Sequence, residues 1–531
     1  MRKSVKIKKT TGWLLVLILL CTGTAGCSNL QDFQVESLTG KEETDEFTSL
    51  GLLPEFDYEV PESLPNILVD QVGYAIGSKK VAMINGEAPP ETFSLLDAET
   101  GREVYTGKVE SKGYDPSVNA YISYADFTDY NTVGSYYIQA ASIGRSYAFE
   151  ILEEPYKDIL TKVFKQYYFN RCGLTLSAEL AGEAAHNACH SREAQMKDEA
   201  MIKCDVSGGW HVDEIGSRDV ERGCQAVNTL LLAYELYPDD MDDDMGIPES
   251  GNGIPDVLDE VKYEIDWLLK MQDAKSGAVY ASVSSVDNKN MGYILYIDGI
   301  TMEATIHFAA TMAKFSYLYQ GYDREFATLC LQASDRAYRY VENYLADVSQ
   351  EQYFFAAAEL YRATGGYQYH SVVKSYLTQN PEADLENDFA FWGCVTYLST
   401  KQKVDVDLCE TVTQNLMRKG ETISFASKDS KLLVNTDEKQ GGNAGLLRDM
   451  SRLAVVDHII TNHEYATVLE NHAHYMLGRN LQSISYLDGV GGRNYRDVDV
   501  SLGIMNQVNQ NAELLLLFAA IMDDELVVGE E

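Results

Sequence analysis

The chain has 531 residues with a formal net charge of −38, and 45% of its residues are hydrophobic. This length allows two or three domains with a sizeable core. So large an excess of acidic residues argues against binding to nucleic acid and other polyanions, because like charges repel. A neutral polymer or a cation is therefore the expected ligand.

Residues 1–27 have the pattern of a bacterial lipoprotein signal peptide. A basic start precedes the apolar run GWLLVLILLCTGTAG, which is short for a membrane span and ends in small residues. Cys27 closes the run in the order TAGC, which resembles a lipidation site. We expect export to the bacterial cell surface and a lipid anchor to the membrane at Cys27. An ordinary cleaved signal with a chance cysteine is the alternative.

The next two segments differ in composition. Residues 28–64 are polar and acidic, which predicts a flexible tether. Residues 65–152 hold β-branched or alternating runs such as KKVAMING and GSYYIQAASIG, separated by turn signals such as ETG at 99–101. This second pattern predicts a small β-sandwich.

From residue 156 to 525 the apolar residues follow a helical period. In DVLDEVKYEIDWLLKMQ, Val257, Leu258, Val261, Ile265, Leu268 and Leu269 form one stripe. Several such segments of ten to twenty residues are joined by loops rich in Gly and Asp. They predict an all-α toroid or solenoid.

Several segments, in the same order, resemble glycoside hydrolase family 9 in its subtype with an N-terminal immunoglobulin-like domain. They are NILVDQVGYAIGSKKVAMING, DVSGGWH, AVNTLLLAYELYPD, GNGIPDVLDEVKYEIDWLLKMQD, ATIHFAATMAKFSYLY, FFAAAELYRATG, HAHYMLGRN and SYLDGVG. The resemblance implies a mainly α fold, an (α/α)6 barrel over residues 156–525 preceded by a small immunoglobulin-like β-sandwich. It also implies a ligand of the β-1,4-glucan type.

The resemblance also locates the catalytic positions, and this chain departs from the family there. The family places two aspartates after GGWH and a glutamate ahead of the last helix, because inverting hydrolysis needs a general base and a general acid. In register, the aspartates fall on Val212 and Ile215, and the glutamate falls on Met505. None of these three side chains can carry a proton. The family's His-His-Arg stretch is absent as well.

Displaced acids are the candidates for compensation. Asp213 and Glu214 lie in the same loop, and Glu513 lies eight residues after Met505. Catalysis tolerates little misplacement of such groups. A solvated loop or helix charge is the competing interpretation of each of the three acids.

A metal site is a further implication of the resemblance. Cys172, Cys189, His190 and His211 match the positions at which this subtype binds a structural zinc. Two thiolates and two imidazoles are a common tetrahedral zinc set, and four protein ligands leave no open position for chemistry. A Cys172–Cys189 disulfide with packed histidines is the alternative.

The segment PESGNGIPDVLDE is a candidate calcium loop. Glu249, Asn252, Asp256 and Asp259 offer oxygen ligands around a turn. An Asn-Gly turn ahead of a helix with an acidic first turn accounts for the same residues. The remaining cysteines past the signal, 204, 224, 330, 394 and 409, are expected to be buried free thiols.

Three functional hypotheses follow. The first is a surface lipoprotein, a pseudoenzyme that binds or handles a β-glucan polysaccharide with lost or strongly altered hydrolysis. The second is an active endo-β-1,4-glucanase-like enzyme that uses rearranged carboxylates. The third is a non-catalytic structural or partner-binding protein in exopolysaccharide assembly.

Overall fold

The structure is a computed structural model that describes residues 58–288, 292–435, 442–460, 463–499, 503 and 507–522. The predicted lipidation site Cys27, nearly all of the predicted tether and Met505 lie outside these residues. The described residues belong to one compact unit. None of its helices is both long enough and apolar enough to cross a membrane.

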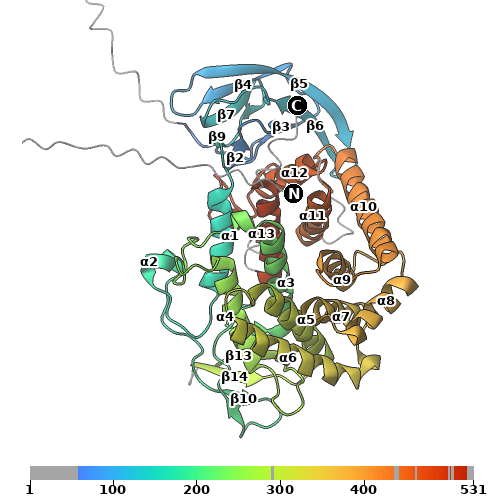
Figure 1. The fold of residues 1–531 in the computed structure, drawn as a ribbon. Coiled ribbons are helices and arrows are strands. Elements are labelled where there is room, and N and C mark those ends of the chain that lie inside the picture. The colour runs from blue at the N-terminus through green and yellow to red at the C-terminus, as the bar shows by residue number, and fades with distance from the viewer. Residues whose placement is uncertain are drawn as a thin grey trace, which may run out of the picture. The chain divides into compact units, whose positions relative to one another are not determined.

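Short strands build the N-terminal β-sandwich (Figure 1). They are β1 (Ile67–Leu68), β2 (Gly73–Ala75), β3 (Val81–Asn85), β4 (Thr92–Asp97), β5 (Glu103–Asp115), β6 (Ala120–Asp126), β7 (Gly134–Ala140), β8 (Gly144–Arg145) and β9 (Phe149–Leu152). The hydrogen-bonded order is β1-β3-β6-β5-β4-β7-β9-β2, with β8 on β7. The first half of the long strand β5 pairs with β4 and its second half pairs with β6. The strand β5 is therefore part of both sheets of the sandwich.

Helices make up most of the remaining chain. They are α1 (Lys157–Phe169), α2 (Ala178–Ala181), α3 (Val220–Leu236), α4 (Asp256–Lys270), α5 (Met302–Tyr319), α6 (Arg324–Glu342), α7 (Gln350–Thr364), α8 (Tyr367–Gln379), α9 (Asp388–Ser399), α10 (Val406–Asp429), α11 (Gly442–Ile459), α12 (Ala466–Met476) and α13 (Val508–Met522).

Six of these helices form an inner ring, packed in the order α11, α13, α3, α5, α7 and α9. The inner helices are apolar on nearly every side; in α13, every residue from Leu514 to Ile521 is buried. The outer helices are amphipathic, and α4 buries the predicted stripe from Val257 to Leu268. The fold is therefore the expected (α/α)6 barrel behind an immunoglobulin-like sandwich.

The connectivity fixes one end of the barrel as the place for a site. Each outer helix leads through a connecting segment into the next inner helix, which runs back beside it, so the inner helices are parallel. Their amino ends share one end of the barrel, together with the loops that enter them. The GGWH segment, residues 208–211, belongs to one of these loops, because the chain after it leads into α3 at Val220.

A small sheet at this end was not predicted from the sequence. It has the order β11-β10-β14-β13-β12, formed by β10 (Ala194–Met196), β11 (Lys203–Cys204), β12 (Arg218–Asp219), β13 (Ser282–Asn288) and β14 (Gly292–Ile297). Three of its strands have two or three residues, too few for a two-residue alternation to be visible. The sheet ties the segment ahead of α3 to the hairpin ahead of α5.

The sandwich contacts the helices through buried polar groups. Asp70 Oδ2 lies 2.9 Å from His474 Nδ1, and Gln71 Nε2 donates to the carbonyl of Ser483 at 2.9 Å. Leu68 and Met83 of the sandwich share an apolar cluster with Leu432 and Val434, which follow α10. The two parts are thus joined by directional as well as apolar contacts.

Candidate metal centre and active-site loop

Side chains of α4 contact the GGWH segment and fix its position. Gly208 and Gly209 have φ values of +108° and +77°, and a Cβ on Gly209 would lie 2.6 Å from the Trp267 ring. Trp210 is buried; its indole Nε1 donates to Glu260 Oε1 and its amide donates to Glu264 Oε2, both at 2.8 Å. Burial raises the pKa of Glu264 to about 8. Glycine is needed here because the main chain approaches an aromatic ring.

The same segment runs beside the residues that follow α1. The amide of Cys172 donates to the carbonyl of Gly209 at 2.8 Å, and the amide of His211 donates to the carbonyl of Asn170 at 2.9 Å. This antiparallel contact places a cysteine and a histidine that are 39 positions apart on neighbouring main chains. It explains how the first and last predicted ligands meet.

A buried ion pair anchors this contact. Arg171 is 1% exposed, and its guanidinium donates to Glu260, which is fully buried, and to Glu249 at distances of 2.9–3.1 Å. Burial raises the pKa of Glu260, and the adjacent Arg171 opposes that rise. Loss of one partner of such a pair costs about 3–5 kcal/mol, because the other charge stays buried.

All four predicted metal ligands come together. The ligand atoms of Cys172, Cys189, His190 and His211 lie within 4.8 Å of one another. Cys189 Sγ lies 3.5 Å from His211 Nε2 and accepts a hydrogen bond from the amide of Gly173. Cys172 is buried and the other three side chains are partly exposed. Within the described residues this is the one such group of three or more His, Cys, Asp or Glu side chains.

The donor set fits a metal ion. Both cysteines are free thiols, so the alternative of a disulfide is not realised in the structure. A hydrogen bond to Cys189 and burial raise the pKa of the Cys172 thiol, whereas the hydrogen bond from Cys172 lowers the pKa of Cys189. His190 Nδ1 is buried without a hydrogen-bond partner. An orphaned imidazole nitrogen beside a thiolate is the arrangement that a metal satisfies.

The two aligned base positions carry no chemistry. Val212 packs against the barrel core, and its amide donates to the carbonyl of Ser217 at 2.9 Å. Ile215 is 43% exposed. Neither side chain can accept a proton, and their alignment with the family's two aspartates stays a prediction. Met505, at the family's acid position, is outside the described residues.

The displaced acids of this loop face solvent. Asp213 is exposed, and its Oδ1 accepts from the amides of Ile215 and Ser217 at 3.1 and 2.8 Å. This pattern is that of a side chain that closes its own turn. Glu214 is exposed as well. Both acids therefore lie where the competing interpretation, a solvated loop charge, places them.

Glu513 differs from these two acids. It lies on the inner helix α13, is only partly exposed, and has no hydrogen bond or ion pair among the described residues. Burial, with the nearby charge of Asp388, raises the pKa of Glu513 to about 8 against the opposing effect of Arg452 and Arg448. A carboxyl group with such a pKa is protonated at neutral pH and can donate a proton.

Acids at the amino ends of the inner helices were missed by the sequence reasoning. The first turns of α3, α5, α7 and α9 hold Glu221, Glu303, Glu351 and Asp388. Burial, together with Asp219 and Glu303, raises the pKa of Glu221, so acids of α3 and α5 lie near one another. In the sequence, these residues appear as an acid near the start of each predicted helix. Helix dipoles favour acids at that position in any protein, so the pattern does not distinguish a functional acid from a structural one.

The predicted calcium ligands serve other partners. Glu249 accepts from Arg171, and Asn252 Nδ2 donates to Asp259 Oδ2 at 2.8 Å. Asp256 Oδ2 accepts from a main-chain amide and a serine hydroxyl, and burial raises the pKa of Asp256 to about 6. Its other oxygen is buried without a partner. Calcium at this segment stays a prediction.

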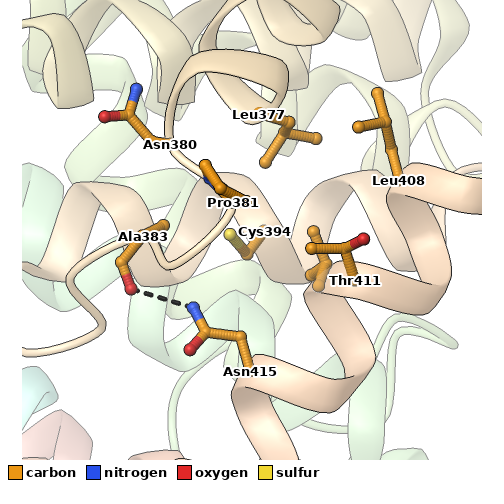
Figure 2. A pocket seen from close by; sticks show the side chains of 9 residues that line it. Leu377, Asn380, Pro381, Ala383, Cys394, Leu408, Thr411 and Asn415 are labelled. Atoms are coloured by element: carbon orange, nitrogen blue, oxygen red, sulfur yellow. Dashed lines mark hydrogen bonds between the residues drawn. The ribbon is translucent and has the colours of Figure 1, made fainter.

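Two hollows lie beside the loop between α8 and α9, and neither is an evident substrate site. The first is shown in Figure 2 and is lined by Leu377, Asn380, Pro381, Ala383, Cys394, Leu408, Thr411, Val412 and Asn415. The volume that the centre of a water molecule can occupy there is about 10 Å³, which is enough for roughly one water. The second is an open depression of about 260 Å³, where Arg418 pairs with Glu382 and Lys419 with Glu386.

The comparisons with known proteins agree with the fold. Residues 156–508 match the family described as "Glycosyl hydrolase family 9", and residues 62–145 match "Cellulase N-terminal ig-like domain". The cellodextrinase of Butyrivibrio fibrisolvens is 28% identical over 480 residues, which cover 82% of this chain and 86% of that protein. Endoglucanase D of Acetivibrio thermocellus is 28% identical over 462 residues, 80% and 73% of the two chains. The crystal structure of a metagenome-derived family 9 endoglucanase superposes with a TM-score of 0.77 at 24% identity, over 86% of this chain and 98% of that one.

Proposed function

The chain belongs to glycosyl hydrolase family 9, and from this premise we propose that it binds β-1,4-glucan-type polysaccharide without hydrolysing it by the family's route. The observation that carries the proposal is the loop after His211. Its two aligned positions are Val212 and Ile215, and its own acids, Asp213 and Glu214, are exposed.

The chemistry of inverting hydrolysis explains why this substitution matters. One carboxyl group must protonate the leaving oxygen, and another must take a proton from a water held between the two groups, about 6.5–9.5 Å apart. A branched aliphatic side chain neither takes a proton nor orders a water. Binding has no such requirement, so a chain that keeps the barrel can keep its ligand class.

The ligand class is supported by the relatives and by charge. The relatives are named as a cellodextrinase and an endoglucanase. A net charge of −38 favours a neutral glucan over an acidic polysaccharide at physiological salt.

Calorimetry with cello-oligosaccharides of increasing length tests the binding proposal. We expect saturable heat that grows with chain length, and none with an acidic polysaccharide as the matched control. No heat at high oligosaccharide concentration would overturn it and favour the third hypothesis, a structural or partner-binding protein.

Hydrolysis by rearranged carboxylates is the second candidate, and Glu513 is the observation that favours it. This group alone among the three displaced acids is both shielded from solvent and without a partner. The candidate predicts release of reducing ends that collapses in Glu513→Gln. Asp213→Asn is the matched control, because Asp213 already serves its own turn.

For the metal, we propose zinc in a structural role, held by Cys172, Cys189, His190 and His211. Zinc favours two thiolates with two imidazoles, whereas calcium takes oxygen ligands. When bound, zinc would supply a cross-link between the segment after α1 and the loop before α3. Metal analysis of the purified protein should give one equivalent of zinc, and His211→Ala should lose it.

For localisation, we propose export and lipid anchoring at Cys27. The order of a basic start, an apolar run and TAGC supports this proposal. Mass analysis of the mature N-terminus should find a lipidated Cys27 in the membrane fraction, and Cys27→Ser should release the protein from it.

A further inference from the structure

His190 links the metal group to the loop that carries the replaced catalytic positions. We propose that the bound metal fixes the course of loop 212–217 through His190, and that Gly216 is the positioning residue that admits the His190 ring. This inference depends on the zinc site proposed above and is independent of glucan binding.

The first step is the tautomer of His190. Its Nε2 lies 3.1 Å from the carbonyl oxygen of Ile215. A carbonyl oxygen can only accept, so Nε2 carries the hydrogen and the neutral ring presents the lone pair of Nδ1. Nδ1 is buried without a hydrogen-bond partner, and His190 belongs to the group of four candidate ligands. The ring would therefore bind the metal through Nδ1 while Nε2 donates to the loop.

The second step is the space that the ring needs. A Cβ on Gly216 would lie 2.1 Å from His190 Cε1 and 2.6 Å from Nε2. Gly216 also has a φ of +81°, which side chains other than glycine rarely adopt. On its other side the ring contacts Tyr293 of β14, with ring centroids 4.4 Å apart. The imidazole is thus confined between the loop and the β13–β14 hairpin.

The third step is the set of hydrogen bonds within the loop. The amide of Gly216 donates to the carbonyl of Asp213, and the amide of Val212 donates to the carbonyl of Ser217. Asp213 Oδ1 accepts from the amides of Ile215 and Ser217. Because these hydrogen bonds connect the loop residues to one another, we expect the contact between His190 and the Ile215 carbonyl to restrain the whole loop.

The fourth step is the strain that the metal offsets. His190 has a φ of +46°, a left-handed conformation that is strained for a residue other than glycine. A metal bond at Nδ1 keeps the residue there, and so keeps the Ile215 contact. Outer partners of a metal ligand change metal affinity about 10- to 100-fold when they are altered.

The test compares Gly216→Ala with Gly113→Ala, which shares the φ of +81° but has open space around its Cβ position. Zinc affinity is measured by competition with a chromogenic chelator. We expect Gly216→Ala to bind zinc about 10- to 100-fold more weakly than wild type, and Gly113→Ala to bind as wild type does. Equal affinity in all three proteins would overturn the proposal.

Hydrogen exchange of the wild-type protein, with zinc and after chelation, keeps the proposal testable even if Gly216→Ala fails to fold. We expect chelation to speed the exchange of the amides of Val212, Gly216 and Ser217, and to leave strand β7 of the sandwich unchanged. Loop amides that exchange at the same rate with and without zinc would overturn the proposal, as would a wild-type protein that binds no zinc. Neither experiment uses a glucan, so a failure of the glucan proposal leaves both results unaffected.

Discussion

The residues before and after His211 differ in what the fold does with their chemical groups. On one side, Cys172 and the adjacent pair Cys189 and His190 come from two segments, and their ligand atoms lie within 4.8 Å of one another and of His211. On the other side, Asp213 and Glu214 are adjacent in sequence, yet both face solvent. Next to His211, the indole of Trp210 donates a hydrogen bond to Glu260 and fixes the main chain at this point.

This difference distinguishes the residues that hold the loop in position from the positions at which hydrolysis would need carboxyl groups. Cys172, Arg171 and Glu260 are buried, and Arg171 has directional partners in Glu260 and Glu249. The positions that would do chemistry contribute only packing through Val212 and exposed surface through Ile215. Under our proposal, this family 9 barrel keeps its scaffold with other residues at its catalytic positions.

Removing the metal should lower the free energy of unfolding more than any of the substitutions below. Structural zinc in small domains contributes about 10 kcal/mol or more, and in this larger barrel we expect chelation to lower the free energy of unfolding by on the order of 5 kcal/mol. Thermal unfolding followed by circular dichroism, with and without chelator, measures it. Cys409→Ser, which alters a free thiol outside the metal group, should keep the same dependence on metal. An unchanged unfolding midpoint after complete zinc removal would contradict the structural role.

Arg171→Ala should have the next largest effect. It leaves Glu260 buried without its cation, and we expect a loss of about 3–5 kcal/mol in chemical denaturation. Arg339→Ala is the matched control, because its pair with Asp335 is exposed and worth about 1 kcal/mol or less. If the two variants lose equal stability, the anchor of the metal segment lies elsewhere.

Glu513→Gln should have a smaller effect that depends on pH. Burial raises the pKa of Glu513 to about 8 in the folded protein, above the ordinary value of a glutamate. The folded state then holds a proton that the unfolded state has lost, so the contribution of Glu513 to stability is full below the ordinary value and declines as the pH rises through 8. Glutamine cannot ionise, so the variant should gain about 1 kcal/mol on wild type between pH 5 and pH 9, a figure reduced for partial exposure.

Denaturant unfolding of both proteins at the two pH values measures this difference. Burial also raises the pKa of Asp70 and that of Glu264 to about 8, but both residues are present in both proteins and cancel. Glu214→Gln, which alters an exposed acid, should give no such gain. The same pH dependence in wild type and Glu513→Gln would show that Glu513 ionises freely.

Asp213 variants should show the smallest effect. Asp213→Asn keeps an oxygen that can accept from the amides of Ile215 and Ser217, so we expect almost no change in stability. Asp213→Ala removes that acceptor and should cost about 1 kcal/mol. Chemical denaturation measures both variants, and equal stability of Asp213→Ala and Asp213→Asn would contradict the role of this side chain as a turn acceptor.

Some of these features were predictable because they depend on local patterns or family landmarks. The helical stripe from Val257 to Leu268 gave α4, and the β-branched runs gave the sandwich. The four candidate metal ligands were predicted through the resemblance, since their spacing along the chain is not a general zinc signature. The structure then brought them together.

Other features depend on tertiary contacts that no single segment encodes. The two-residue strands β11 and β12 exist because loops meet there, and no alternation can show in two residues. The charges that act on Glu513 come from α9 and α11, which carry Asp388 and Arg452. The calcium candidates looked like ligands in sequence, but Glu249 pairs with Arg171, 78 positions away.

The most direct measurement of the central claim is the release of reducing ends from cello-oligosaccharides by the zinc-loaded protein. Our proposal that Val212 and Ile215 occupy the positions of the family's two aspartates predicts no release above the protein-free blank, under conditions where calorimetry detects binding. Release by the wild-type protein that is abolished in Glu513→Gln would contradict the claim and establish a hydrolase with rearranged carboxylates.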